Sequence, residues 1–240
     1  MTERTRPVSI HVPVLARVEG EGALDLAIED GNITRLRLRI FEPPRFFEKF
    51  LEGHHYTEIP DLVARICGIC PVAYQVTAAQ ALEQLYGVEL SPWAQAMRRV
   101  FYCGEWIQSH SLHIHLLAAP DFFGCSNAIE LAQLAPDAVR RGLRLQGLGN
   151  ELMDLFGARS VHPVGVRIGG FHAAPPVARV RELRAQLVDA LTEAEALLRW
   201  AAAIPLPPDD QAFVSVAMRH PGLYAIETGD IAASDGLTIG

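Results

Sequence analysis

The stretch RICGIC, at residues 65–70, contains the side chains of this chain that are best suited to chemistry. Cys67 and Cys70 stand three positions apart, with Arg65 before them and Pro71 directly after them. Two thiols at this spacing can form a redox disulfide, supply half of a structural zinc site or bind a catalytic metal. A helix that starts at Pro71 would point its N-terminus at the pair, and this positive end, together with Arg65, would stabilise thiolates.

The rest of the chain separates these alternatives only in part. A structural zinc site needs four ligands, whereas the other cysteines, Cys103 and Cys125, lie 33 and 55 residues beyond Cys70 and form no second pair. We expect these two to be small core residues. A thioredoxin-like site would need alternating strands and helices, which the sequence does not show. Paired soft thiolates suit nickel, copper(I), zinc or an iron–sulfur cluster. Because two ligands are half of a site, the other half is either on a partner or missing.

The composition limits the class of protein. The chain has 240 residues, of which 50% are hydrophobic, enough for one large domain or two small ones. Its formal net charge of −7 argues against nucleic-acid binding. No signal peptide and no uninterrupted apolar run of membrane-spanning length is visible. We therefore expect a cytoplasmic protein that binds neither nucleic acid nor membrane.

The N-terminal region has the alternation of a β-hairpin. In LDLAIEDGNITRLRLRI, residues 24–40, apolar and polar side chains alternate on both sides of Asp30-Gly31, a typical hairpin turn. Three arginines of the second strand would then face water: Arg35, Arg37 and Arg39. We interpret them as a solvated strand face rather than as an anion site.

Helical periodicity replaces this alternation from Pro71 onward. It predicts helices over 71–86, where Gly87 follows, over 93–119, where Pro120 follows, and over 136–156. A fourth helix should run from Pro176 to before Pro205. The last residues, GDIAASDGLTIG, indicate a turn and the beginning of a strand that would have nothing to pair with.

The predicted fold is therefore mainly α, with a small β-rich N-terminal part and a helical bundle as its core. We divide the chain into a β-rich segment at 1–60, a helical bundle with the RICGIC motif at 61–204, and a segment at 205–240. The last segment would be the start of a C-terminal part that this chain does not complete.

Four motifs together resemble a known family. They are ARVEGEG at 16–22, PRFFEKFLEG at 44–53, RICGIC, and HPVGVRIGG at 162–170. In this order they resemble the large, catalytic subunit of nickel–iron hydrogenases. Three further stretches are most similar in sequence to the cytoplasmic, multi-subunit group linked to NAD(P), which includes the sulfhydrogenase type. They are IFEPPRFFEKF, CPVAYQ and YCGEWIQSHSLHIHLLAAPDFFG. The resemblance covers nearly the whole chain but only about the first half of a family chain.

The resemblance implies a reversible oxidation of dihydrogen at a nickel–iron centre whose iron carries cyanide and carbon monoxide. Cys67 would be a terminal nickel ligand and Cys70 would bridge nickel to iron. Glu19 falls where the family has a glutamate that carries protons away, and Glu21 is a weaker candidate for that role. Glu48 matches a glutamate that binds a magnesium or iron ion.

Other residues would lie beside the metal centre by the same resemblance. Arg65 precedes the cysteines, and His162, with Arg159 before it, matches a loop close to the centre. Tyr74 stands four positions after Cys70, where many members of the family have a histidine that forms a hydrogen bond near the bridging sulfur. The tyrosine hydroxyl could donate similarly but cannot become a cation.

The resemblance also implies partners and leaves alternatives open. Electrons would pass to an iron–sulfur small subunit and then to flavin- and NAD(P)-binding diaphorase subunits. The family's second CxxC is absent, so the chain is either a fragment of the large subunit, or a second polypeptide donates the C-terminal half. Two other functions are a non-catalytic relative of the quinone-site subunit of respiratory complex I and a thiol-paired structural zinc module. The intact RICGIC argues against the former, because a quinone pocket has no use for such a pair.

Overall fold

The structure is a computed structural model that describes residues 6–206, 208 and 210–239. The chain divides into two compact units, residues 1–50 and 51–240, and each is described by itself. Helices form most of the second unit and small sheets occur in both, in agreement with the predicted class in its coarse form. In the described part of the chain, no helix combines the length and the apolar character needed to cross a bilayer.

The first unit contains a three-stranded antiparallel sheet. Its strands β1 (Val8–Val12), β2 (Gly22–Glu29) and β3 (Asn32–Ile40) lie in this order, and the short helix α1 (Phe47–Phe50) follows. The predicted hairpin is confirmed: Leu24 faces Leu38, and Asp30 and Gly31 both have positive φ, as a tight hairpin turn requires. The strand β1 extends the hairpin, so that one face of the sheet is apolar throughout.

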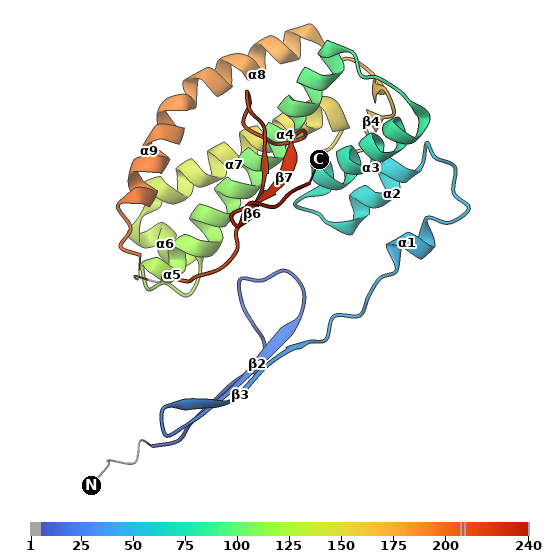
Figure 1. Cartoon of the computed structure of the whole chain (residues 1–240). Coiled ribbons are helices and arrows are strands. Elements are labelled where there is room, and N and C mark those ends of the chain that lie inside the picture. Colours follow the sequence, from blue (N-terminus) through green and yellow to red (C-terminus); the bar gives the residue numbers. More distant parts are fainter. Residues whose placement is uncertain (1–5, 207, 209, 240) are drawn as a thin grey trace. The chain divides into compact units, whose positions relative to one another are not determined.

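The second unit begins with short helices and continues with long ones (Figure 1). Its helices are α2 (Ile59–Val63), the 3₁₀ turn η1 (Ala64–Ile66), α3 (Pro71–Tyr86), α4 (Pro92–Leu112), the π-helix η2 (His113–Ala118), α5 (Ala119–Phe122), α6 (Ala128–Leu134), α7 (Pro136–Gly157), α8 (Val177–Asp189) and α9 (Leu191–Ala202). Its strands are β4 (Val166–Arg167), β5 (Gly170–Phe171), β6 (Val216–Arg219), β7 (Asp230–Ala233) and β8 (Thr238–Ile239).

The ends of α3 and α7 follow the sequence signals. Pro71 occupies the first turn of α3, and Gly87 ends the helix in the left-handed conformation at φ 64°. Pro136 likewise starts α7, which ends one residue later than predicted, at Gly157. The start of α3 thus directly follows the RICGIC motif, and the end of α7 shortly precedes the HPVGVRIGG motif.

Three expectations about the later elements were wrong. The predicted helix over 93–119 is not stopped by Pro120, because α4 already ends at Leu112 and η2 follows it. Pro120 lies in the first turn of α5, where a missing N–H is tolerated. The fourth predicted helix is two helices, α8 and α9, which meet at Ala190 as they follow α7. The C-terminal strand does have a partner, since β7 pairs with both β6 and β8.

The core of the second unit lies where α3, α4 and α7 meet. Its buried side chains come from these helices and from β4: Val72, Val76, Ala79, Phe101, Tyr102, Met153, Phe156 and Val166. A second cluster joins α7 to α8 and α9 through Leu145, Leu148, Leu152, Leu183 and Ala190. In Figure 1, α8 and α9 accordingly run along the side of α7.

Two glycines allow α4 and α7 to approach closely. A Cβ on Gly149 of α7 would collide with the backbone nitrogen of Gln108 and lie 2.7 Å from the carbonyl oxygen of Gly104. A Cβ on Gly104 of α4 would lie 2.9 Å from the Leu152 side chain. Neither position has room for a larger residue, so the crossing is set by backbone contact.

Buried charged groups connect α3 to α4 in two different ways. Arg98 of α4 donates two hydrogen bonds of 2.7 and 2.6 Å to the Glu83 carboxylate of α3, and both side chains are buried. Glu105 of α4, also buried, accepts hydrogen bonds from the backbone N–H groups of Val72 at 2.6 Å and Ala73 at 3.4 Å. Burial raises the pKa of Glu105 to about 7, although these two N–H groups oppose the rise.

The glycine crossing predicts opposite effects for two substitutions in α7. Gly149→Ala should lower the free energy of unfolding by about 1–3 kcal/mol, because the methyl group has to push the helices apart. Gly147→Ala is the matched control: no atom lies within 4 Å of its Cβ position, so it should raise stability by about 0.5–1 kcal/mol. Urea unfolding of both variants checks this, and equal effects of the two would contradict the close crossing.

The raised pKa of Glu105 predicts how stability depends on pH. Its folded pKa of about 7 lies above the ordinary value of 4.5, so the folded state favours the neutral form. The contribution of Glu105 to the free energy of unfolding is fully present below pH 4.5 and is lost as the pH rises through 7. Between these limits the free energy of unfolding of the wild type should fall by about 2–3 kcal/mol relative to that of Glu105→Gln, which does not titrate. Unfolding curves of both proteins at each pH measure the difference, and a difference that stays constant would argue against a neutral Glu105.

Candidate metal centre

The RICGIC motif lies between a 3₁₀ turn and the start of a long helix. The turn η1 ends at Ile66, Cys67 is extended, and Cys70 is the residue that precedes the first turn of α3. The backbone N–H of Cys70 donates to the sulfur of Cys67 at 3.2 Å. The sulfurs of the two half-buried cysteines lie next to each other, with the Cα atoms 5.5 Å apart. The fold therefore directs both sulfurs to one place.

This arrangement fits the cysteine share of a metal site. As thiolates, two sulfurs that meet can act as two soft ligands for one metal or bridge two metals. Among residues 6–206, 208 and 210–239, no group of three or more His, Cys, Asp or Glu side chains is gathered as a metal site. The candidate ligands that meet here are the two cysteine sulfurs.

The loop after α7 holds the motif from both sides. The Nδ1 atom of His162 lies 2.8 Å from the carbonyl oxygen of Ala64, which is in η1. The next residue, Pro163, accepts a 2.6 Å hydrogen bond from the Gln75 side chain, which is in α3. His162 itself has a positive φ of 50°, and Arg159 donates to its carbonyl oxygen at 2.6 Å. The structure therefore brings His162 next to the motif, in contact with its backbone.

Arg65 is exposed and lines a polar cavity beside the motif. The cavity has a volume of about 570 Å³ and is lined by Thr57, Glu58, Asp61, Leu62, Arg65, Arg167 and His172. An ion pair of 3.1 Å between Arg167 and Asp61 crosses its wall. Arg65 is thus available to a charged group at this surface, and its action on the sulfurs stays a prediction.

Tyr74 stands on the exposed side of α3. Its side chain is 38% exposed, and it borders an apolar cavity of about 340 Å³ together with Val63, Ala73, Thr77, Ala78 and Ala81. The residue lies one helical turn after Cys70, as the sequence spacing required. Its proposed hydrogen bond near a bridging sulfur stays a prediction.

Glu19 and Glu48 belong to the first unit. Glu19 is an exposed residue of the loop between β1 and β2, and Glu48 is an exposed residue of α1. The two units are described separately, so the assignments of these residues as proton carrier and ion ligand stay predictions.

The cysteines outside the motif are not paired with each other. Cys103 and Cys125 are free and half-buried, and burial raises the pKa of the Cys103 thiol. Cys125 packs against a small cluster formed by Ala119, Leu131 and Val139. Neither belongs to the buried core, so the expectation that both are small core residues is not met.

Glu105 is the residue next to the motif that sequence reasoning missed. Its carboxylate reaches the first turn of α3, two and three residues after Cys70. The signal was its spacing: Phe101, Glu105 and Gln108 recur every three or four residues, so a carboxylate occupies the buried face of α4. A charged residue on such a face needs a buried partner, here the end of another helix.

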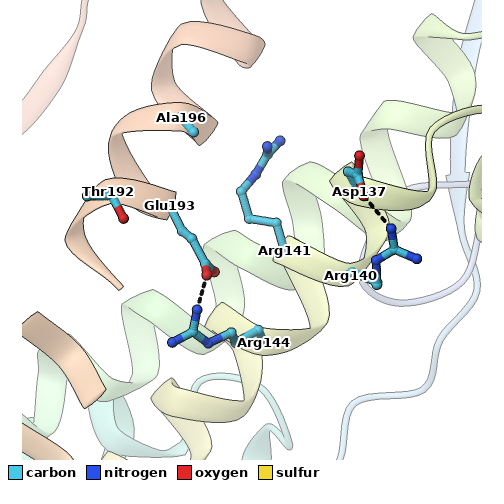
Figure 2. A pocket seen from close by; sticks show the side chains of 7 residues that line it. All are labelled: Asp137, Arg140, Arg141, Arg144, Thr192, Glu193 and Ala196. Carbon is cyan, nitrogen blue, oxygen red and sulfur yellow. Dashed lines mark hydrogen bonds and ion pairs between the residues drawn. The ribbon is translucent and has the colours of Figure 1, made fainter. Parts of the chain in front are cut away.

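Another cavity gathers arginines but lies on a different part of the unit. Figure 2 shows this cavity of about 340 Å³ between α7 and α9, lined by Asp137, Arg140, Arg141, Arg144, Thr192, Glu193 and Ala196. Arg140 pairs with Asp137 and Arg144 pairs with Glu193. Arg141 lies 5.2 Å over the Trp200 ring and donates to His115 at 3.3 Å. Arg141 and Arg144 hold α7 to its neighbours and Arg140 pairs within α7, so we assign no ligand to this cavity.

Comparison with known proteins gives consistent matches. A family model described as nickel-dependent hydrogenase matches residues 45–141. The alpha subunit of sulfhydrogenase 2 from Pyrococcus furiosus is 38% identical over 69% of this chain and 40% of its own length. The alpha subunit of sulfhydrogenase 1 from the same organism is 32% identical over 95% of this chain and 55% of its own length. The beta subunit of the NAD-reducing hydrogenase HoxS from Cupriavidus necator is 32% identical over 65% of this chain and 35% of its own length.

Solved structures show the same fold. An NAD⁺-reducing [NiFe]-hydrogenase in the H₂-reduced state superposes with a TM-score of 0.76 and 30% identity, over 98% of this chain and 56% of that one. The Ni-Fe-Se hydrogenase from D. vulgaris Hildenborough gives a TM-score of 0.71 over 82% of this chain and 44% of that one. The chain thus spans about half, or less, of the length of these proteins. It belongs to the nickel-dependent hydrogenase family and corresponds to the N-terminal part of the large subunit.

Proposed function

We propose that this chain supplies the first half of the metal site in the large subunit of a nickel–iron hydrogenase. The whole protein would oxidise dihydrogen reversibly and exchange electrons with NAD(P) through partner subunits. The single observation that carries the proposal is the meeting of the Cys67 and Cys70 sulfurs in a motif of this family. A named relative that reduces NAD and a sulfhydrogenase relative support the choice of this branch.

Cys67 and Cys70 would bind the centre as thiolates, Cys67 to nickel and Cys70 between nickel and iron. When bound, a nickel–iron centre with cyanide and carbon monoxide on its iron supplies the Lewis acid that heterolytic cleavage of dihydrogen needs. Both sulfurs bind metal as thiolates. The contacts of His162 with Ala64 and of Gln75 with Pro163 hold the motif without involving the sulfurs.

Proton transfer would begin at a cysteine sulfur, the base that the motif itself provides. Glu19 would take the proton at a carboxylate oxygen and pass it toward solvent, as an exposed acid can. Glu48 would bind a magnesium or iron ion through its carboxylate, a ligand type that hard cations prefer. Arg65, Tyr74 and His162 would surround the centre.

The remaining parts of the proposal concern the assembly. Electrons would leave through an iron–sulfur small subunit and diaphorase subunits that bind flavin and NAD(P). The other metal ligands would come from the C-terminal half of the large subunit. A cytoplasmic location would match the pool of pyridine nucleotide. Purification of the chain with its native partners, followed by identification of the subunits by mass spectrometry, tests this part.

Replacing a motif cysteine should abolish both metal binding and activity. In the complete complex, Cys67→Ser or Cys70→Ser should lose nickel and hydrogen-dependent dye reduction, because an alkoxide is too hard a ligand for this metal. Cys103→Ser, a half-buried cysteine outside the motif, is the control and should keep both. Metal analysis and dye reduction under hydrogen give the answer, and full turnover in either motif variant would refute the proposal. Zinc alone in the wild type would indicate a structural zinc module instead.

Replacing Glu19 should slow proton transfer without changing the metal content. Glu19→Gln in the complete complex should keep nickel and iron but slow dihydrogen turnover and the exchange of hydrogen isotopes with solvent by about 100-fold, a usual cost of losing a positioned proton carrier. Glu21→Gln, two residues away in the same loop, replaces the weaker candidate for this role and should leave both rates unchanged. Equal exchange rates in the Glu19 variant and the wild type would make Glu19 an ordinary solvated acid.

A further inference from the structure

The contacts of His115, in the π-helix η2, fix its ring in the neutral form. Its Nδ1 atom lies 3.0 Å from the carbonyl oxygen of Ser111, which can only accept, so Nδ1 carries a hydrogen. Its Nε2 atom lies 3.3 Å from the Nε atom of Arg141, which can only donate, so Nε2 offers a lone pair. The side chain is fully buried. A buried histidine is thus held without charge directly beside a permanent cation.

The ring of His115 also joins α7 to α9. Trp200 of α9 lies nearly parallel to it, with 9° between the ring planes and 5.5 Å between the centroids. Phe123 stacks on Trp200 in the same way, at 8° and 5.7 Å. On the side of α7, a Cβ at Gly142 would collide with the His115 side chain, so the ring is pressed against the helix backbone. Arg141 extends from α7 toward α9 and lies 5.2 Å over the Trp200 ring (Figure 2).

The helix α9 depends strongly on this contact. All of its residues belong to the described part of the chain, and each is at least partly exposed. Its ion pair, between Glu193 and Arg144, is itself largely open to water, and such pairs contribute little to stability. The remaining attachments are the packing of Leu197 on the cluster that joins α7 to α8 and the stacking of Trp200. A change at His115 therefore acts on one of the main attachments of α9.

A proton on His115 would disrupt the arrangement. It would have to bind at Nε2, which faces the N–H of Arg141, so the hydrogen bond would be lost and two cations would lie side by side. Burial lowers the pKa of His115 and the charge of Arg141 lowers it further, whereas the hydrogen bond to Ser111 opposes both. The protonated ring is more stable where water can reach it, which requires Trp200 to move away.

We propose that His115 is a pH-sensitive latch for α9. When Nε2 takes up a proton, Arg141 and Trp200 leave the ring, and α9 detaches from α7 and η2. The latch is fully closed above the ordinary histidine pKa of 6.5 and loosens as the pH falls below it, because the detached state binds the proton more readily. This inference does not depend on the metal centre or on the proposed function.

The position of α9 shows what the latch would uncover. An apolar cavity of about 430 Å³ lies where α9 meets α4, α7 and α8. Its lining consists of Trp106, Ile107, His110, Ser111, Leu145, Leu148, Leu187, Ala190, Leu191, Ala194 and Leu197. Because three of these side chains and the Leu191 end of the wall belong to α9, detachment of α9 would open this apolar surface to water.

The other charged groups around the latch are already engaged or face solvent. They are Asp137 and Arg140, which pair with each other in α7, Glu193 of α9, which pairs with Arg144 of α7, and His113, an exposed residue of η2. Arg141 keeps its charge throughout, because a guanidinium is not deprotonated in proteins. The response to pH between 5.5 and 7.5 is therefore assigned to His115.

The experiment measures hydrogen exchange of the α9 peptide in the full chain by mass spectrometry at pH 5.5, 6.5 and 7.5. Each rate is divided by the intrinsic exchange rate at that pH, which gives the protection of the helix. In the wild type, protection of α9 should fall by about tenfold per pH unit wherever the detached His115 is protonated and the closed one is neutral. The peptide of α8 is the internal reference and should keep its protection.

Two variants assign the effect to one residue. His115→Gln cannot titrate but keeps an acceptor for Arg141, so its α9 protection should be the same at all three pH values. His113→Gln is the matched control, because it removes an exposed histidine two residues away in the same π-helix. It should keep the pH dependence of the wild type. Circular dichroism at each pH confirms that the variants are folded.

The outcomes decide the proposal in either direction. A loss of α9 protection at low pH in the wild type and His113→Gln, absent in His115→Gln, supports it. Constant protection in the wild type would overturn it, as would an equal loss in α8 or the same loss in His115→Gln. If His115→Gln does not fold, nuclear magnetic resonance of the His115 ring in the wild type carries the test. Its protonation has to coincide with the loss of α9 protection, and protonation at a different pH would overturn the proposal.

Discussion

The close crossing of α4 and α7 is the constraint on which the candidate site depends. Backbone contact at Gly104 and Gly149 sets the two helices at a fixed separation. The residue after Gly104 is Glu105, which can then reach the first turn of α3. The end of α7 leads into the loop with His162, which contacts η1. One helix crossing thus positions both residues that hold the cysteine motif: Glu105 contacts the chain after Cys70, and His162 contacts it before Cys67.

The loop after α7 shows how tightly this frame is packed. A Cβ on Gly165 would overlap the backbone of Phe156, so the chain returns directly against the last turn of α7. The positive φ of His162 is part of the same sharp path. A non-glycine residue in this conformation costs free energy, which the contacts with Ala64, Arg159 and Gln75 offset. The strain is thus confined to the segment that has to reach the motif.

Much of the fold could be predicted from local signals, whereas the site could be predicted only in part. The hairpin around Asp30-Gly31 and the ends of α3 at Pro71 and Gly87 follow from turn and cap residues, which act locally. The break between α8 and α9 and the pairing of β7 depend on packing between distant segments, so no local pattern revealed them. Cys67 and Cys70 were recognisable from their spacing. The role of Glu105 was not, because its partners are N–H groups of a helix 33 residues earlier in the chain.

The two ways in which α4 holds α3 have different consequences for the metal site. The Arg98–Glu83 pair is buried and bidentate, so its geometry is fixed and its charges cancel. The contact of Glu105 with α3 does not cancel a charge, because a helix end offers only about half of one. The ion pair is therefore suited to rigidity, at the far end of α3. The carboxylate lies at the opposite end of α3, the end that follows Cys70, so a buried charge acts on the helix end next to the motif.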